Sequence, residues 1–260
     1  MTISDSLTVD QAVDRMRALR DLLPATDGVA VFNRMYLTVT ELVRDRLTDG
    51  YFEDPAAMAA LDALFAGRYL RAVDAAAAGT RPPACWRPLF ELRGHPGIHP
   101  LQFALAGMNA HIEHDLPLAV LDTCRALGRR PAGLAADYRR INDLLAQVED
   151  EVRDSLLPGP DELPPADALL HVIGVWSIDR AREAAWASVL ALWELRPVPF
   201  AYAAVSTALD GSVGMVCRAL LTPLDGRTQA GPPAAPGRER GGRARGGARA
   251  GRGGWLGLGG

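Results

Sequence analysis

Apolar residues recur along most of the chain at the three- and four-residue intervals of an α-helix, whereas the alternation typical of a β-strand does not recur. Proline and glycine punctuate the breaks. The pattern predicts an all-α protein, a single-domain bundle of about seven helices with one further short helix. The expected helices are 8–23, 29–47, 55–78, 85–92 (the short one), 101–118, 135–157, 166–195 and 200–221. Pro117 is expected to bend or end the fifth.

The helical pattern stops near Leu221, and the composition changes abruptly after it. From 231 the chain reads GPPAAPGRERGGRARGGARAGRGGWLGLGG, which offers almost nothing to bury and cannot offset the entropy of ordering itself. We therefore predict an all-helical domain at 1–224 and a disordered Arg/Gly/Pro-rich tail at 225–260. A shifted reading frame in GC-rich DNA would also explain such a tail, and both interpretations make it dispensable.

The segment 101–118, LQFALAGMNAHIEHDLPL, places ionisable side chains where a helix would bury them. At about 100° per residue, His111 and Asp115 fall within the apolar face and are neighbours on it. The apolar residues of that face are Leu101, Ala104, Leu105, Met108 and Ile112. Burying an unpaired carboxylate is costly, so Asp115 needs a partner. The pattern therefore predicts a buried polar site around His111 and Asp115.

Three other helices also direct polar side chains toward their apolar faces. The predicted neighbours of the site are Asn33 and Tyr36 on 29–47, Glu149 on 135–157, and Trp176, Arg180 and Glu183 on 166–195. Buried ionic networks stabilise a fold less than apolar packing does, so this many inward polar groups favours a functional pocket. A purely structural network, in which Arg180 pairs with Asp115, Glu149 or Glu183, is the alternative.

This arrangement suggests an enzyme that uses acid/base chemistry on a small, largely apolar metabolite. His111 would be the acid or base because imidazole titrates near neutral pH, and Asp115 would fix its tautomer. The six neighbours named above would bind the substrate, with aromatic rings suited to a carbon-rich ligand. The competing hypothesis is a non-catalytic ligand-binding or protein-interaction module. The pattern identifies neither a reaction nor a substrate.

No cofactor is expected from the sequence. If a metal is bound, His111, His114 and Asp115 are the expected ligands, because nitrogen and oxygen donors suit Zn, Fe or Mn. The chain has neither an HExxH motif nor paired ExxH motifs. The doublet His114-Asp115 is also found in helical metal-dependent phosphohydrolases of the HD type, which gives a further alternative. In that case His95 or His99 upstream and Asp179 downstream would complete the metal site.

Charge and cysteine content narrow the expected partners and location. All 28 basic residues are arginine, and residues 1–224 carry 21 Arg against 29 acidic residues, whereas 225–260 carry 7 Arg against 2. The acidic body argues against nucleic acid as a partner, and the RGG-like triplets of the tail are the only hint of one. Three cysteines without CxxC spacing and no long apolar run predict a cytoplasmic protein with no membrane partner. A homo-oligomer is compatible with the sequence.

Four stretches together resemble a known family. They are FNRMYLTVTELV at 32–43, PLQFALAGMNAHIEHDLPLAV at 100–120, INDLLAQVEDEV at 141–152 and WSIDRAREAAW at 176–186. They are similar to an all-helical family of actinobacterial proteins classed as a domain of unknown function, and AGMNAHI and RAREAAW are the most specific parts. The resemblance covers 27–221, implies a single helical domain that excludes the tail, and supplies no reaction, cofactor or catalytic residue.

Overall fold

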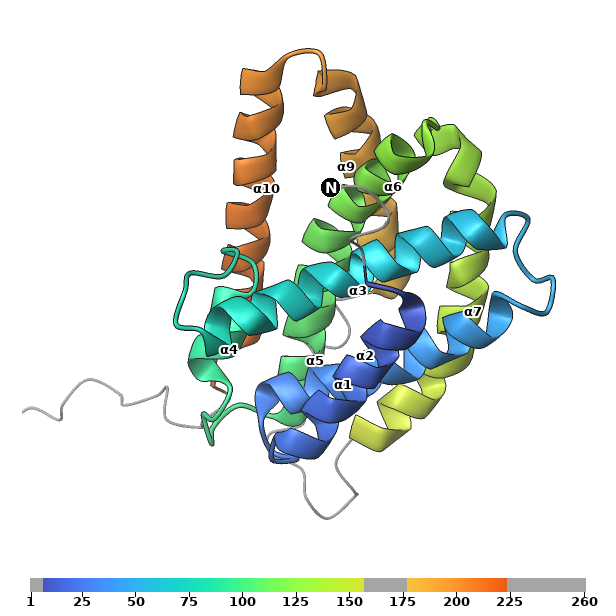
Figure 1. Ribbon diagram of the computed structural model, residues 1–260. Coiled ribbons are helices and arrows are strands. Elements are labelled where there is room, and N and C mark those ends of the chain that lie inside the picture. The colour runs from blue at the N-terminus through green and yellow to red at the C-terminus, as the bar shows by residue number, and fades with distance from the viewer. Residues whose placement is uncertain (1–6, 157–176, 224–260) are drawn as a thin grey trace, which may run out of the picture. The chain divides into compact units, whose positions relative to one another are not determined.

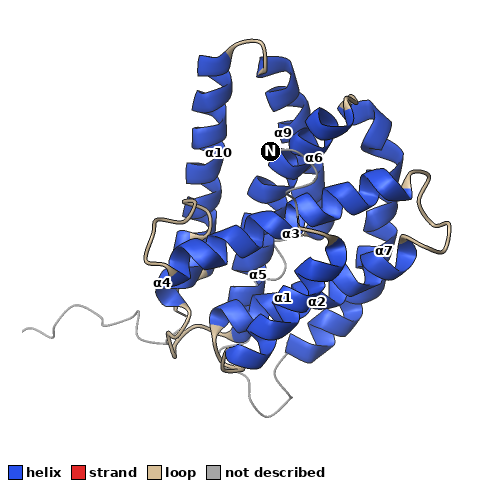
Figure 2. Cartoon of the chain, in the orientation of Figure 1, coloured by secondary structure: helices blue, strands red, loops and turns tan. Residues whose placement is uncertain are grey.

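Every regular element in the residues described here is helical, which confirms the predicted all-α class (Figure 2). The computed structural model describes residues 7–156 and 177–223, except for the side chains of 146–156. Its helices are α1 Val9–Leu22, α2 Gly28–Arg46, α3 Pro55–Ala77, α4 Arg87–Leu92, α5 Pro100–Asn109, the π-helix η2 Ala110–Asp115, α6 Leu116–Leu127, the 3₁₀-helix η3 Pro131–Leu134, α7 Ala135–Leu156, α9 Ile178–Leu195 and α10 Pro199–Leu220 (Figure 1). The predicted tail and the predicted helical residues 166–176 lie outside the described residues.

Local sequence signals set several helix ends. Thr8 and Gln11 form the capping box expected from their spacing, with the Thr8 hydroxyl accepting from the Gln11 N–H at 3.2 Å. Asp27 and Asp54 accept backbone N–H groups at the starts of α2 and α3. Gly128 ends α6 in the left-handed conformation, with φ of 64°. These short-range interactions explain why most predicted helix boundaries within the described residues agree closely with the observed ones.

Helices α5, η2 and α6 form one continuous helical rod through the interior. The rod packs against α2 and α3 and also contacts α9 and α10. Pro117 was expected to bend or end this helix, but the helix continues to Leu127. The π-helix precedes it, with the Leu116 N–H donating to the His111 carbonyl five residues back. Pro117 consequently lies in the first turn of α6, where its missing N–H is tolerated.

A cluster of stacked and edge-on rings forms the centre of the core beside this rod. Phe32 contacts the rings of Tyr69 and Trp86, with centroids 5.1 and 5.3 Å away. Its other flank faces Gly107 of α5, where a Cβ atom would lie 2.3 Å from a Phe32 ring carbon. Glycine at 107 therefore allows α2 and α5 to approach closely.

Substituting this glycine should destabilise the fold even though alanine favours helices. We expect Gly107→Ala to lower the free energy of unfolding by about 1–3 kcal/mol, because the Phe32 ring is held by its neighbours and cannot move aside. The matched control is Gly211→Ala in α10, where a Cβ would meet nothing within 4 Å. The control should raise stability by roughly 0.5–1 kcal/mol. Urea unfolding of both variants measures the contrast, and equal stability of the two would contradict the packing argument.

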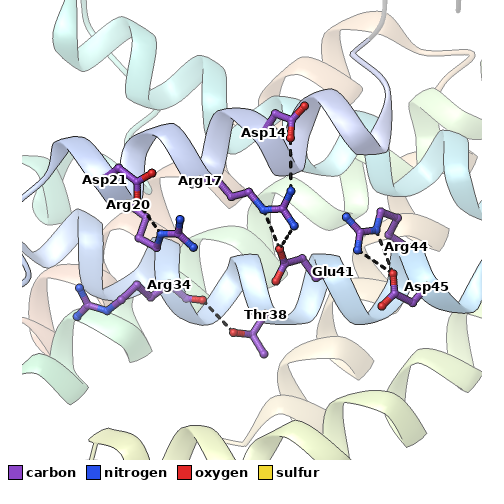
Figure 3. A network of polar contacts seen from close by, with 9 residues as sticks. All are labelled: Asp14, Arg17, Arg20, Asp21, Arg34, Thr38, Glu41, Arg44 and Asp45. Atoms are coloured by element: carbon purple, nitrogen blue, oxygen red, sulfur yellow. Dashed lines mark hydrogen bonds and ion pairs between the residues drawn. The ribbon is translucent and has the colours of Figure 1, made fainter.

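Ion pairs link α1 to α2 on the surface (Figure 3). Arg17 of α1 donates to the Glu41 carboxylate of α2, with 2.6 Å between Nη2 and Oε1, and also lies 3.5 Å from Asp14. Arg44 and Asp45 form a similar pair along α2. Each exposed ion pair contributes about 0–1 kcal/mol to the free energy of unfolding, so these contacts add little to the stability of the fold.

Helix α10 is apolar in composition, yet most of its surface is exposed. It forms a hairpin with α9 (Figure 1), and among the described helices it alone is long and apolar enough to cross a membrane by length and composition. Only 17% of the most apolar 18-residue stretch of α10 is buried. The large apolar residues exposed on α10 are Phe200, Val205, Met215 and Val216.

Candidate functional site

A cavity of about 170 Å³ lies between α2, α3, α5, η2, the start of α6, α7 and α9. Most of its lining is apolar, namely Phe32, Met35, Val39, Val43, Met58, Leu61, Phe65, Leu101, Leu105, Met108, Ile112, Leu116, Ile141, Leu145 and Ile178. Four polar or ionisable residues complete the lining, namely Tyr36, Asp62, His111 and Arg182. An apolar cavity with a few convergent polar groups is typical of a small-molecule binding site.

His111 is held between aromatic rings at the cavity wall. Its imidazole stacks on Phe65, with centroids 3.6 Å apart and planes 5° apart, and its centroid lies 4.3 Å from that of Tyr36. Nδ1 lies 3.1 Å from Oδ2 of Asp115. Nε2 is buried and has no hydrogen-bond partner among the described residues. Burial lowers the pKa of His111 despite the nearby carboxylate, so the ring is neutral at neutral pH.

Asp115 is the buried hub of the polar site. Its Oδ2 accepts from His111 Nδ1 and from Trp86 Nε1 at 2.9 Å, and its Oδ1 accepts from His114 Nδ1 at 2.9 Å. Burial alone would raise the pKa of Asp115, but the hydrogen bonds from both histidines hold it well below its ordinary value. An ionised Asp115 fixes His111 with its proton on Nδ1, which leaves Nε2 unprotonated.

The sequence interpretation missed Asp62, which lines the same cavity. Its side chain is 8% exposed, and Oδ2 has no hydrogen-bond partner within the described part of the chain. Burial raises the pKa of Asp62 to about 7. One feature of the sequence could have revealed Asp62. It lies four residues after Met58 and three before Phe65, on a face of α3 that is otherwise apolar.

Tyr36, which the sequence analysis expected near His111, lines the same cavity. Its hydroxyl is buried and, like Asp62 Oδ2, has no partner among the described residues. Burial and the nearby Asp62 carboxyl raise its pKa well above the ordinary value, so the hydroxyl stays protonated. Tyr36, Asp62 and His111, each of which has a buried polar atom without a partner among the described residues, therefore all line one cavity.

The prediction that Arg180 and Glu183 point into the site is wrong, because both side chains are exposed. Helix α9 instead buries Arg182, which lines the cavity and donates from Nη2 to the Tyr138 carbonyl at 2.7 Å. Its Nε donates to Asn142 Oδ1. Apolar residues surround most of α9, including the exposed Leu190, so the pattern alone could not identify its buried face.

Asn33 is buried but does not line the cavity. Its amide donates to the Met16 carbonyl at 2.8 Å and its oxygen accepts from the Tyr69 hydroxyl at 3.2 Å, so it connects α2 to α1 and α3. Trp176 lies outside the described residues, as does the side chain of Glu149. Of the eight predicted site residues, the structure places Tyr36 and His111 in the cavity lining and Asp115 directly behind His111.

The expected metal ligands His111, His114 and Asp115 do not form a ligand set. Both carboxylate oxygens of Asp115 accept imidazole hydrogen bonds, and the Nε2 atom of His114 is directed toward Asp210, 3.7 Å away, rather than toward the cavity. The supporting residues of the phosphohydrolase alternative are also dispersed. His95 and Asp179 are exposed, and His99 caps the start of α5.

The model of a family of unknown function, DUF5995, matches residues 9–223. The chain belongs to the DUF5995 family. This confirms the resemblance drawn from the sequence and extends it to the first helix, while the match stops before the Arg/Gly-rich tail. No curated protein and no solved structure matches the chain. Membership in DUF5995 carries no reaction, so any function has to be argued from the cavity itself.

Proposed function

We propose that the protein is an enzyme that transfers a proton on a small, largely apolar molecule held in the cavity. The observation that carries this proposal is that Tyr36, Asp62 and His111 line one mostly apolar cavity, and that each has a buried polar atom without a partner among the described residues. Leaving a buried polar group unpaired costs about 1–3 kcal/mol, so binding of a ligand that supplies hydrogen-bond partners to these groups is favoured.

His111 is the general base in this proposal. Its neutral ring presents the Nε2 lone pair to the ligand, and the imidazolium formed on proton transfer is stabilised by the ionised Asp115 at Nδ1. Trp86 and His114 hold Asp115 in place through their own hydrogen bonds. Phe65 and Tyr36 fix the plane of the imidazole. The base is thus preorganised before the ligand binds.

Asp62 supplies the acid. With a pKa near 7, a substantial fraction of this carboxyl is protonated at neutral pH and can donate to an oxygen of the ligand. The matching reaction is enolisation of a carbonyl compound. His111 Nε2 takes a proton from the carbon next to the carbonyl, the C–H electron pair forms a C=C bond, and the carbonyl oxygen takes the proton of Asp62. Tyr36 donates a hydrogen bond to the same oxygen.

The experiment is proton exchange on cyclohexanone, a six-membered ring with one carbonyl. An apolar cavity of about 150 Å³ in another protein binds benzene, so a ring of this size suits the present cavity. In D₂O, the wild-type protein should accelerate incorporation of deuterium next to the carbonyl, measured by NMR. His111→Ala should lower the protein-dependent rate by about 10²–10⁴-fold.

The matched control for this experiment is His95→Ala, which removes an exposed histidine of the loop before α5. Exchange in this variant should equal that of the wild type. Exchange that persists unchanged in His111→Ala would contradict the proposed base. Absence of any wild-type acceleration, with cyclohexanone shown to bind by ligand-observed NMR, would instead favour the non-catalytic ligand-binding alternative, which the mostly apolar lining supports.

A further inference from the structure

A second polar cluster includes His114 of η2, and none of its residues lines the cavity described above. Cys85 Sγ, one ring nitrogen of His114 and one carboxylate oxygen of Asp210 lie within 4.8 Å of one another. The three residues come from the turn before α4, from η2 and from α10. We infer that Cys85, His114 and Asp210 bind a divalent transition-metal ion, and that their sulfur, nitrogen and oxygen donors fit Zn²⁺ best.

The spacing between His114 and Asp210 fits coordination of one metal ion better than a direct hydrogen bond. His114 Nε2 lies 3.7 Å from Asp210 Oδ1, which is too long for a hydrogen bond. Zinc bonds to these donors are about 2.0–2.3 Å long, so neighbouring ligand atoms of a tetrahedral site are roughly 3.3–3.8 Å apart. The observed separation falls in that range.

The residues around the cluster orient its ligand atoms as in known metal sites. Metal-binding histidines usually donate their other ring N–H to a carboxylate. His114 does so here, with Nδ1 2.9 Å from Oδ1 of Asp115, which leaves the Nε2 lone pair free to bind a metal. The oxygens of Asp210 in turn accept the backbone N–H groups of Ala84 and Cys85, each at 2.9 Å.

Close packing of α10 against the turn before α4 keeps the cluster together. A Cβ atom at Gly214 would lie 2.6 Å from the carbonyl oxygen of Ala84, so only glycine allows this approach. The Cys85 side chain is fully buried, and burial holds its pKa far above the ordinary value. Such a thiol is not accessible as a nucleophile, but a metal ion would stabilise its thiolate.

A zinc ion bound to these three ligands would keep a fourth coordination position open. His114 and Asp210 line a surface cleft together with Arg81, Arg87, Ser206 and Thr207. Zinc sites with three protein ligands commonly bind water or a substrate group at the fourth position. The two arginines would favour an anionic group there. This inference departs from the expectation of no metal, because Cys85 and Asp210 are 125 residues apart and no spacing rule could relate them.

Zinc binding to the full-length protein tests the inference. After treatment with a chelator, the wild type should rebind about one Zn²⁺ per chain, measured by elemental analysis and calorimetric titration. Cys85→Ser and His114→Gln should each weaken binding at least about tenfold. The matched control is Cys124→Ser, which alters a different buried cysteine and should bind Zn²⁺ like the wild type. Equal affinity of the wild type and Cys85→Ser would overturn the assignment.

A measurement on the unmodified chain avoids reliance on variants that fail to fold. Co²⁺ replaces Zn²⁺ in tetrahedral sites, and a cysteine ligand then gives a sulfur-to-metal charge-transfer band in the near ultraviolet. We expect this band in wild type, with displacement by Zn²⁺. Its absence at saturating Co²⁺ would reject Cys85 as a ligand. Neither outcome depends on proton exchange at His111, so this inference and the proposed function can fail separately.

Discussion

Replacing Asp115 with alanine is expected to lower the free energy of unfolding by about 3–5 kcal/mol. Three buried donors, Trp86 Nε1, His111 Nδ1 and His114 Nδ1, would lose their shared acceptor. Each would then remain desolvated without a partner, since Asp115 is 2% exposed and water has little access to replace it. The loss should exceed that from removing a single buried hydrogen bond, because three hydrogen bonds depend on one side chain.

Equilibrium unfolding in urea, followed by circular dichroism, measures this change. The control is Asp74→Ala, which removes a carboxylate that pairs with Arg15 on the surface and is 54% exposed. Its stability should stay within about 1 kcal/mol of wild type. If Asp115→Ala were as stable as this control, Asp115 could not be the hub that orients His111.

Asp62→Asn is expected to make the protein more stable than wild type at alkaline pH. The pKa of Asp62 is about 7 in the folded protein, against an ordinary value of 3.8. Below both values the carboxyl is protonated in folded and unfolded states alike, and Asp62 contributes no pH dependence. Between them the unfolded chain releases the proton while the folded protein retains it, so wild-type stability falls as pH rises, and the fall ends above about pH 7.

The asparagine variant lacks this fall because its side chain does not titrate. The stability of Asp62→Asn minus that of wild type should therefore increase between pH 4 and pH 8, by up to about 4 kcal/mol. Urea unfolding at both pH values gives the difference. Asp74→Asn, on the same helix but exposed, should show a change below about 1 kcal/mol. A pH-independent difference for Asp62→Asn would mean that Asp62 titrates normally and is not the proposed acid.

The contact between His111 and Asp115 could be predicted because one helical segment carries both residues. His111 and Asp115 are close in sequence, so any helical conformation brings them together, and their burial followed from the apolar residues around them. The π-helix changed what else reaches Asp115. It brings His114, which is adjacent in sequence, into contact with the same carboxylate. A sequence read at 3.6 residues per turn does not predict where a helix changes locally to π-helical hydrogen bonding.

Residues contributed by other helices were harder to predict. Asp62 is a single acidic residue in an alanine-rich helix, and its importance depends on the helices that cover it. Arg182 replaced Arg180 and Glu183 as the inward residue because α9 is apolar on most sides. When apolar residues surround a helix, its buried face is selected by its neighbours and not by its own pattern.

The sequence by itself determined the helical class, most helix boundaries and the buried pair His111–Asp115. Each of these depends on residues within one helix or one turn, where periodicity and capping act locally. Only the tertiary structure brought Tyr36, Asp62 and His111 to one cavity, and Cys85, His114 and Asp210 to one cluster. These contacts join helices far apart in sequence, and they depend on close packing at Gly107 and Gly214, which no single helix reveals.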